Sequence, residues 1–330
     1  MLILSRADVE ALIDRDRLLD AVARAMSDLS AGKASMPGRN AAMVPERDAL
    51  LAAMPAYLPS AGALTTKLVT VFPHNTGVPS HQAVIAVFDP ESGTPIALMD
   101  GTVITAERTA AGSALATRHL AREDARVLAV LGTGVQARSH LRAVVRVRKF
   151  DEVRVAGRDV AKARALAAEI SKELGLEIRA APSFEAAMAG ADVICGATHP
   201  HEPVIRRERI RPGTHVNSVG FSLDGREVDA ATIRDALVVV DQRDAALAPP
   251  PRGSNDLVWA IRDGAITPDD VYAEIGELVA GTKPGRTRAD QITLYKSVGV
   301  AVQDAAAAAL VLAAARERGL GTEVDIGPSA

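Results

Sequence analysis

Apolar residues recur with two different periods in the first third of the chain. Up to Gly32, a short apolar run precedes two stretches with apolar residues at helical spacing, which predicts a strand followed by helices. From about Met36 to Met99 the pattern changes to short β-rich runs that Pro, Gly and Asn separate. Residues 102–121 are rich in small side chains and predict a helix. This part is therefore typical of an α+β domain.

Residues 126–245 alternate strand-like and helical runs. The strand-like runs include "RVLAVLG", "EVRVAG", "DVICGAT", "THVNSVG" and "ALVVVD". Such alternation predicts a doubly wound α/β domain, with a parallel sheet and crossover helices. The last segment, from Thr293 to Gly319, is predicted as one long helix that returns to the first domain. We predict two domains, residues 1–122 with 303–330, and residues 123–302.

The composition excludes several classes of protein. Of 330 residues, 48% are hydrophobic and 24% charged, as in soluble globular proteins. The net charge of -3 provides no general attraction to nucleic acid or to a membrane surface. A single cysteine, Cys195, excludes an internal disulfide and fits a reducing compartment. Because charge interrupts the N-terminal apolar run early, we expect a cytoplasmic protein, and we expect the Ala-rich segment 298–315 to be a buried helix.

A glycine-rich loop follows the strand at 127–131 and opens a helix. Gly132, Gly134 and Ala137 match G-x-G-x-x-A in this context. The first glycine permits a tight turn, the second lets the backbone approach a pyrophosphate, and the small third residue lets the helix pack on the strand. The helix start then offers free N–H groups to phosphates. This predicts a Rossmann-type dinucleotide site, with a plain strand–turn–helix as the alternative.

The end of the next strand bears on the choice of dinucleotide. Enzymes that use NAD usually carry Asp or Glu there, to bond the 2′-hydroxyl of the ribose. In this chain Gly157 stands at that place and Arg158 follows. The arrangement favours NADP(H), while NAD(H) stays possible. Alternatively, Arg158 is a solvated turn residue; in either case we expect Asp159 to cap the next helix.

Three cations in the first domain predict an anionic ligand. Lys67 and Arg108 lie within segments expected to be buried, and Arg39 precedes them in a loop. Buried cations require an anionic partner. Each alone fits a salt-bridged surface residue, but together they predict a carboxylate pocket, in which Arg provides a two-pronged fork and Lys can also donate a proton. His81 either faces this pocket or is a hydrogen-bonded structural histidine.

Other residue types carry little chemistry. The run from His199 to His201 has no acid or thiolate at ligand spacing nearby, so no metal site is predicted. Cys195 lies within an apolar strand and is expected to be an inert core residue.

Several runs together resemble the ornithine cyclodeaminase/mu-crystallin family over nearly the whole chain. They include "MPAYLP", "TKLVTVFPHN", "PSHQAVIAVFDPESGTPIALMDG", "EIGELVAGTKPGRT" and "TLYKSVGVAVQD", and above all "RTAAGSALA" followed by "GTGVQA". The resemblance implies a homodimer of two-domain subunits. The N-terminal part with the C-terminal helix would bind substrate and pair subunits, and the Rossmann unit would hold the cofactor. The ligand would be a small imino, keto or amino acid over the nicotinamide.

The resemblance also implies roles for individual residues. Arg39, Lys67 and Arg108 would hold the substrate carboxylate. The cofactor would be held by Gly132, Thr133, Gly134, Val135, Gln136 and Ala137 at the pyrophosphate, Arg158 at the ribose, Thr198 and His199 at its far edge, Val219 beside the nicotinamide, and Lys296, Ser297 and Gly299 closing the pocket.

One position departs from the cyclodeaminase pattern. Cyclodeaminases resemble one another in an Asp two residues after the strand ending "NSVG", where this chain has Ser222 and a loop one residue shorter. A hydroxyl cannot replace that carboxylate as a base for the substrate amine, and Asp224 is the nearest substitute. We therefore expect an NAD(P)H-dependent reductase of an α-imino acid. Arg39 and Arg108 would fix the substrate carboxylate. Lys67 and Arg108 would be the catalytic residues, with Lys67 as proton donor or electrostatic stabiliser. His81 and Ser222 are further candidates for substrate contact. The alternatives are a cyclodeaminase-like lyase with redox-neutral use of NAD, and a non-catalytic NADP-binding protein of the crystallin kind.

Overall fold

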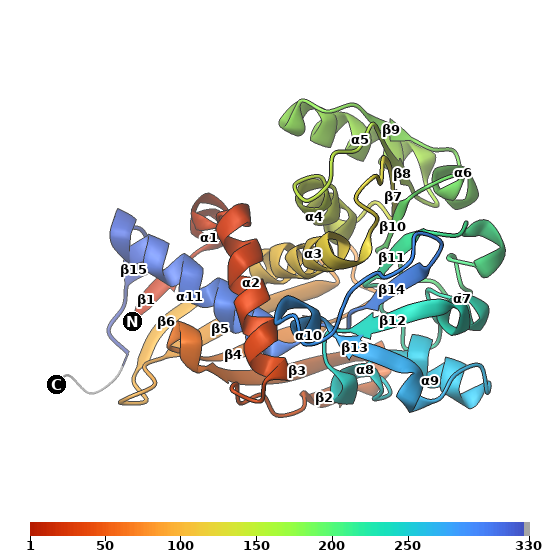
Figure 1. The fold of residues 1–330 in the computed structure, drawn as a ribbon. Coiled ribbons are helices and arrows are strands. Elements are labelled where there is room, and N and C mark those ends of the chain that lie inside the picture. The colour runs from red at the N-terminus through yellow and green to blue at the C-terminus, as the bar shows by residue number, and fades with distance from the viewer. Residues whose placement is uncertain (327–330) are drawn as a thin grey trace. The chain divides into compact units, whose positions relative to one another are not determined.

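The computed structural model describes residues 1–326, which form two compact units (Figure 1). Unit 1 comprises Met1–Arg108 together with the described residues from Val300 onward. Unit 2 comprises Thr109–Gly299, so the helix α3 (Gly101–Leu120) spans the boundary between the units.

A seven-stranded sheet forms the centre of unit 1. Its order is β15-β1-β6-β5-β4-β3-β2, and all neighbours are antiparallel except β1 and β6. The strands are β1 (Leu2–Leu4), β2 (Asn40–Val44), β3 (Ala49–Leu58), β4 (Ala63–Val71), β5 (His81–Phe88), β6 (Pro95–Asp100) and β15 (Thr322–Glu323). Burial alternates along β3 and β4, because successive side chains of a strand point to opposite faces.

Helices cover one face of this sheet. They are α1 (Arg6–Leu12), α2 (Arg15–Ser30) and α11 (Ala301–Arg318), and α11 packs on α2, β3 and β4. Ser5 and Asp8 close a capping box at the start of α1, and Asp14 caps α2. The Ala-rich α11 lies buried along most of its length, as predicted, since small side chains allow close approach to the sheet. Among the helices of residues 1–326, none has the length and hydrophobicity needed to cross a bilayer.

The long C-terminal helix begins later than the sequence pattern predicts. Residues Ile292–Lys296 form the strand β14 of unit 2, and α11 starts only at Ala301. The prediction of one helix from Thr293 was therefore wrong at its start. The segment is rich in β-branched and aromatic residues and is buried on both faces, which favours a central parallel strand. Gly299, with φ of 77°, separates strand and helix. Helix α11 belongs to unit 1, together with the first part of the chain.

Unit 2 is a parallel eight-stranded sheet with helices between its strands, which confirms the predicted doubly wound α/β architecture. The order is β13-β12-β14-β11-β10-β7-β8-β9. The further strands are β7 (Val127–Leu131), β8 (Glu152–Ala156), β9 (Ile178–Ala180), β10 (Val193–Gly196), β11 (His215–Ser218), β12 (Ala236–Val240) and β13 (Val271–Glu274). The helices are α4 (Val135–Val144), α5 (Val160–Leu174), α6 (Phe184–Met188), α7 (Ala230–Asp235), α8 (Arg243–Ala246), α9 (Asn255–Arg262) and α10 (Ile275–Val279).

The strand order places a switch point between β7 and β10. From β7 the chain builds outward through β8 and β9, and then returns to add β10 and β11 on the other side. Successive residues of β7 enter two separate apolar clusters, Leu128 on one face and Ala129 on the other. The carboxyl ends of the strands at such a switch point form the usual crevice for a dinucleotide.

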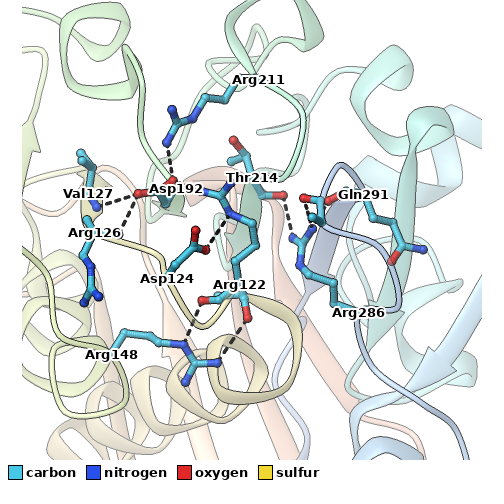
Figure 2. A network of polar contacts seen from close by, with 12 residues as sticks. Arg122, Asp124, Arg126, Val127, Arg148, Asp192, Arg211, Thr214, Arg286 and Gln291 are labelled. Carbon is cyan, nitrogen blue, oxygen red and sulfur yellow. Dashed lines mark hydrogen bonds and ion pairs between the residues drawn. The ribbon is translucent and has the colours of Figure 1, made fainter.

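A network of arginines lies at the amino ends of the strands of the same sheet (Figure 2). The Asp192 carboxylate accepts the N–H groups of Arg126 and Val127, at 2.8 and 2.9 Å, and the guanidinium groups of Arg122 and Arg211. Arg148 donates to carbonyls at the end of α3, at 2.9 Å for that of Arg118. These contacts tie α3 to the sheet, on the edge opposite the crevice.

Candidate functional site

A buried ion cluster occupies the interior of unit 1. Lys67, from an inward position of β4, places Nζ 2.7 Å from Oδ2 of Asp304 on α11. Arg108 donates from Nε to Oδ1 of Asp304, at 2.9 Å, and from Nη1 to Oε1 of Gln303, at 3.1 Å. All three charged side chains are almost inaccessible, with relative exposures of 2%, 4% and 1% for Lys67, Arg108 and Asp304. The cluster thus holds two cations against one carboxylate, and an anionic ligand would balance it.

The electrostatic surroundings shift the protonation of this cluster. Burial lowers the pKa of Lys67 to about 7. The negative charge of Asp304 raises this pKa, whereas the positive charges of Arg108 and Arg39 lower it further. Burial and the nearby Lys67 and Arg108 lower the pKa of His81 to about 4, so this histidine is neutral near pH 7. Burial raises the pKa of Asp304, but its two cationic partners outweigh that effect and hold it below its ordinary value. Lys67 is therefore poised to hold or release a proton near neutral pH.

The structure brings Lys67 and Arg108 together around a shared counter-ion, Asp304. The sequence pattern assigns no role to Asp304, which with Gln303 interrupts the Ala-rich segment 298–315. Two adjacent polar residues in an otherwise Ala-rich buried helix are the signal that could have identified it, because a buried carboxylate needs cations around it. Its partner Arg108 lies 196 positions away in the chain, so no local pattern could connect them.

The glycine loop of unit 2 has the geometry that a pyrophosphate requires. Gly132 has φ of 125°, and a Cβ there would lie 2.5 Å from the carbonyl oxygen of Ala197. Gly134 is the N-cap of α4, and no heavy atom outside its chain neighbours lies within 4 Å of a Cβ built there. Val135, the next residue, is 57% exposed. Ala137 is fully buried and lets α4 pack against the sheet. An open glycine at the start of a helix fits a bound phosphate group.

The end of β8 lies next to this loop. A Cβ on Gly157 would stand 2.5 Å from Cγ2 of Thr133, so only glycine leaves room for that side chain. Arg158 follows and is exposed. Asp159 accepts N–H groups of Ala161 and Lys162 at the start of α5, which confirms it as the helix cap.

The loops after β10 and β11 lie on the other side of the switch point. Thr198 is held by the buried carboxylate of Glu227, while His199 is exposed. Ser222 donates to Oδ1 of Asp224 at 2.9 Å, and Oδ2 of Asp224 lies 3.1 Å from Nδ1 of His201. Asp224 therefore lies beside Ser222, as the hydrogen-bond acceptor of its hydroxyl.

Buried carboxylates also organise the end of β14. Lys296 pairs with Asp256 at 2.9 Å, and Ser297 donates to Asp241 at 3.0 Å. The N–H of Gly299 also donates to Asp241, at 2.7 Å, and burial raises the pKa of that carboxyl. Glu227, Asp241 and Asp256 are not predicted from the sequence pattern. An acidic residue just after an apolar strand, as Asp241 is after "ALVVV", is the available signal.

Cys195 lies in the core, as the sequence predicts. The Cys195 thiol is buried, and burial raises its pKa to about 12, which confirms an inert core residue. Within residues 1–326, no three His, Cys, Asp or Glu side chains are grouped as a metal site would require.

Comparison with known proteins identifies the family. The model of the ornithine cyclodeaminase/mu-crystallin family matches residues 1–319. The chain belongs to this family. It is 41% identical to the ketimine reductase mu-crystallin of Mus musculus over 283 aligned residues. The aligned region covers 85% of this chain and 85% of that protein.

Two solved structures extend the likeness to the whole fold. The structure of Thermococcus litoralis Delta(1)-pyrroline-2-carboxylate reductase, in complex with NADH and L-proline, is 42% identical and superposes with a TM-score of 0.95, covering 98% of this chain and 100% of that one. An archaeal alanine dehydrogenase dimer with bound NAD is 32% identical, with a TM-score of 0.91 and 99% of each chain covered. The family and the fold class predicted from the sequence are thus confirmed.

Proposed function

We propose that this protein reduces the C=N bond of an α-imino acid with a nicotinamide cofactor. The observation that carries the proposal is the buried excess of positive charge at Lys67 and Arg108, in a chain whose second unit presents an open glycine cradle. This reaction class is the one expected from the sequence, and relatives that are a ketimine reductase and a pyrroline-2-carboxylate reductase bear it out. A small imino acid is accordingly the substrate.

Arg108 is suited to bind the substrate carboxylate. Its Nε and Nη1 groups are engaged by Asp304 and Gln303. Its Nη2 group makes no hydrogen bond within residues 1–326, so its donors can meet an incoming carboxylate. We assign Arg39 and His81 to the same pocket, because Arg39 acts electrostatically on Lys67, and Lys67 and Arg108 act on His81.

Lys67 is assigned as the proton donor or electrostatic stabiliser. With a pKa of about 7, its Nζ can carry the proton that the reduced nitrogen requires and recover it from water. Asp304 holds Nζ in one place between turnovers. When bound, the reduced nicotinamide supplies the hydride that the imine carbon accepts.

Unit 2 is assigned to the cofactor. Residues 132–137 would hold the pyrophosphate, and the exposed Arg158 would meet the ribose. NAD(H) and NADP(H) both fit these residues, and Arg158 favours NADP(H). Thr198, His199 and Val219 would line the nicotinamide half, with Ser222 near the substrate. Lys296, Ser297 and Gly299 support the loops of this half through Asp256 and Asp241.

We also propose that the protein is a homodimer formed through the open face of the unit 1 sheet. Leu51, Tyr57, Leu68 and Val84 are exposed there, and Leu68 pairs directly with Val84 across β4 and β5. An apolar sheet face of this kind marks an interface. The archaeal alanine dehydrogenase named above is a dimer. A cytoplasmic location fits the single free thiol.

Absorbance at 340 nm provides the first test of the proposed reaction. Purified protein would be given NADPH or NADH with a panel of cyclic imino acids, and of keto acids with ammonia or methylamine. We expect oxidation of the cofactor with at least one member. Ammonia release from ornithine without a change in absorbance would instead establish a cyclodeaminase-like lyase, and cofactor binding without any turnover would establish a storage protein.

A further inference from the structure

Glu227 carries a carboxylate that four donors surround. Its Oε1 accepts the backbone N–H of Thr198 at 2.8 Å and the Thr198 hydroxyl at 2.7 Å. Its Oε2 accepts the Ser218 hydroxyl at 2.7 Å and the backbone N–H of Gly220 at 2.9 Å. The side chain is 1% exposed. One buried carboxylate therefore joins the loops that follow β10 and β11.

The surrounding backbone is shaped to admit this carboxylate. A Cβ on Gly196 or on Gly220 would lie 2.5 Å from atoms of the Glu227 side chain. Glycine at both positions leaves the space that the carboxylate fills, at the ends of two adjacent strands. Such a close fit at a strand end constrains the loops more strongly than a surface contact would.

The ion pair of Asp256 and Lys296 holds the backbone of Glu227 in place. Asp256 accepts the backbone N–H of Glu227 at 2.8 Å and pairs with Lys296 at 2.9 Å. Lys296 in turn donates to the Ser218 hydroxyl oxygen at 3.2 Å and to the Gly220 carbonyl at 2.9 Å. Because Ser218 accepts from Lys296, its own hydroxyl proton is directed to Glu227.

The direction of these hydrogen bonds has a consequence for Thr198. Since its hydroxyl proton is committed to Glu227, the outward lone pairs of Thr198 Oγ1 can only accept a hydrogen bond. Thr198 lies just past the carboxyl end of β10, on the side of the switch point away from β8. In a doubly wound fold with adenosine at β8, this side takes the nicotinamide half.

We infer that Glu227 is a positioning residue that fixes Thr198 Oγ1 as the hydrogen-bond acceptor for the carboxamide N–H of the nicotinamide. The inference rests on the cofactor assignment of the proposed function and is independent of the substrate. It predicts that Glu227 affects binding of the nicotinamide half and leaves binding of the adenosine half unchanged.

Calorimetric titration of the intact protein separates the two halves of the cofactor. The probes are NAD+, ADP-ribose, which lacks nicotinamide, and 3-acetylpyridine adenine dinucleotide, which lacks the amide N–H. In Glu227→Gln we expect NAD+ to bind up to about tenfold more weakly, as for loss of one hydrogen bond between neutral groups, with ADP-ribose affinity unchanged. In the same variant, the preference of the wild type for NAD+ over the acetylpyridine analogue should disappear.

Two further variants keep the test decisive. Thr198→Val removes the acceptor with a side chain of the same shape, and we expect the same loss for NAD+ relative to ADP-ribose. Asp192→Asn changes a buried carboxylate with four donors at the opposite edge of the sheet, and should lower the Tm without altering that ratio.

Equal losses for NAD+ and ADP-ribose in Glu227→Gln, or an unchanged ratio in Thr198→Val, would overturn the inference. Failure of the proposed function would look different, because an imine panel without turnover leaves these binding ratios as they are. If Glu227→Gln does not fold, Glu227→Asp takes its place, because its shorter side chain withdraws the carboxylate from Thr198 and the same change in the ratio of NAD+ to ADP-ribose affinity is expected.

Discussion

Lys67 on β4 and Asp304 on α11 form an ion pair of 2.7 Å inside unit 1. Both side chains are almost completely shielded from solvent. Arg108 shares the same carboxylate. A carboxylate held between two buried cations leaves a positive charge to be met by the substrate, and that relation underlies most of the expected effects of substitution.

Removal of Asp304 should destabilise the protein strongly. Asp304→Ala leaves Lys67 and Arg108 buried without their counter-ion, and we expect a loss of about 3–5 kcal/mol in the free energy of unfolding. Urea denaturation followed by circular dichroism measures it. Glu317→Ala, on the exposed end of the same helix, is the control and should change stability by less than about 0.5 kcal/mol. A loss no larger than that of the control would contradict the buried pair.

The pH profile of kcat/KM should report the protonation of Lys67. Burial lowers its pKa to about 7, so the protonated donor is present below that pH and is lost as the pH rises through it. We expect the rate to fall above about pH 7 in the wild type. Lys67→Met should lower kcat/KM at least about tenfold and abolish this inflection while the cofactor still binds. An unchanged inflection in Lys67→Met would assign it to another group.

Arg108→Lys tests the carboxylate fork. The change keeps a positive charge beside Asp304 but removes the planar pair of donors, so KM for the imino acid should rise at least about tenfold. Cofactor affinity should stay as in the wild type, since Arg108 belongs to unit 1. Steady-state kinetics with varied substrate measure the effect. A normal KM would remove Arg108 from the proposed pocket.

Arg158→Ala tests the cofactor preference. If the guanidinium meets a 2′-phosphate, kcat/KM for NADPH should fall about 10- to 100-fold while that for NADH changes less than about threefold. Lys162→Ala, one turn into the helix that Asp159 caps, is a charge-matched control. Equal changes for both cofactors would leave Arg158 as a solvated turn residue.

The open sheet face can be tested by its oligomeric state. Leu68→Glu places a charge at the centre of the apolar face, and we expect it to convert the dimer to a monomer in sedimentation experiments. Leu223→Glu is the matched control, because Leu223 is 39% exposed, as Leu68 is, and lies in unit 2. A dimer that survives Leu68→Glu would place the interface elsewhere.

The sequence by itself determined the features that depend on neighbouring residues. Alternation of strands and helices from residue 126 onward predicted the parallel sheet, and the spacing of Gly132, Gly134 and Ala137 predicted an open loop at a helix start. Asp159 was recognised as a helix cap from its position alone. Each depends on backbone geometry over a few residues, which local composition specifies.

Only the tertiary structure decided which distant residues meet. Asp304 is the counter-ion of Lys67 and Arg108 because α11 packs on the strands β3 and β4 of unit 1. Glu227 joins two loops because β10 and β11 are neighbouring strands. The start of the last helix was also decided there, since Ile292–Lys296 gains more from burial between two parallel strands than from local helical order. Burial and pairing of charges are long-range properties, so no periodicity along the chain encodes them.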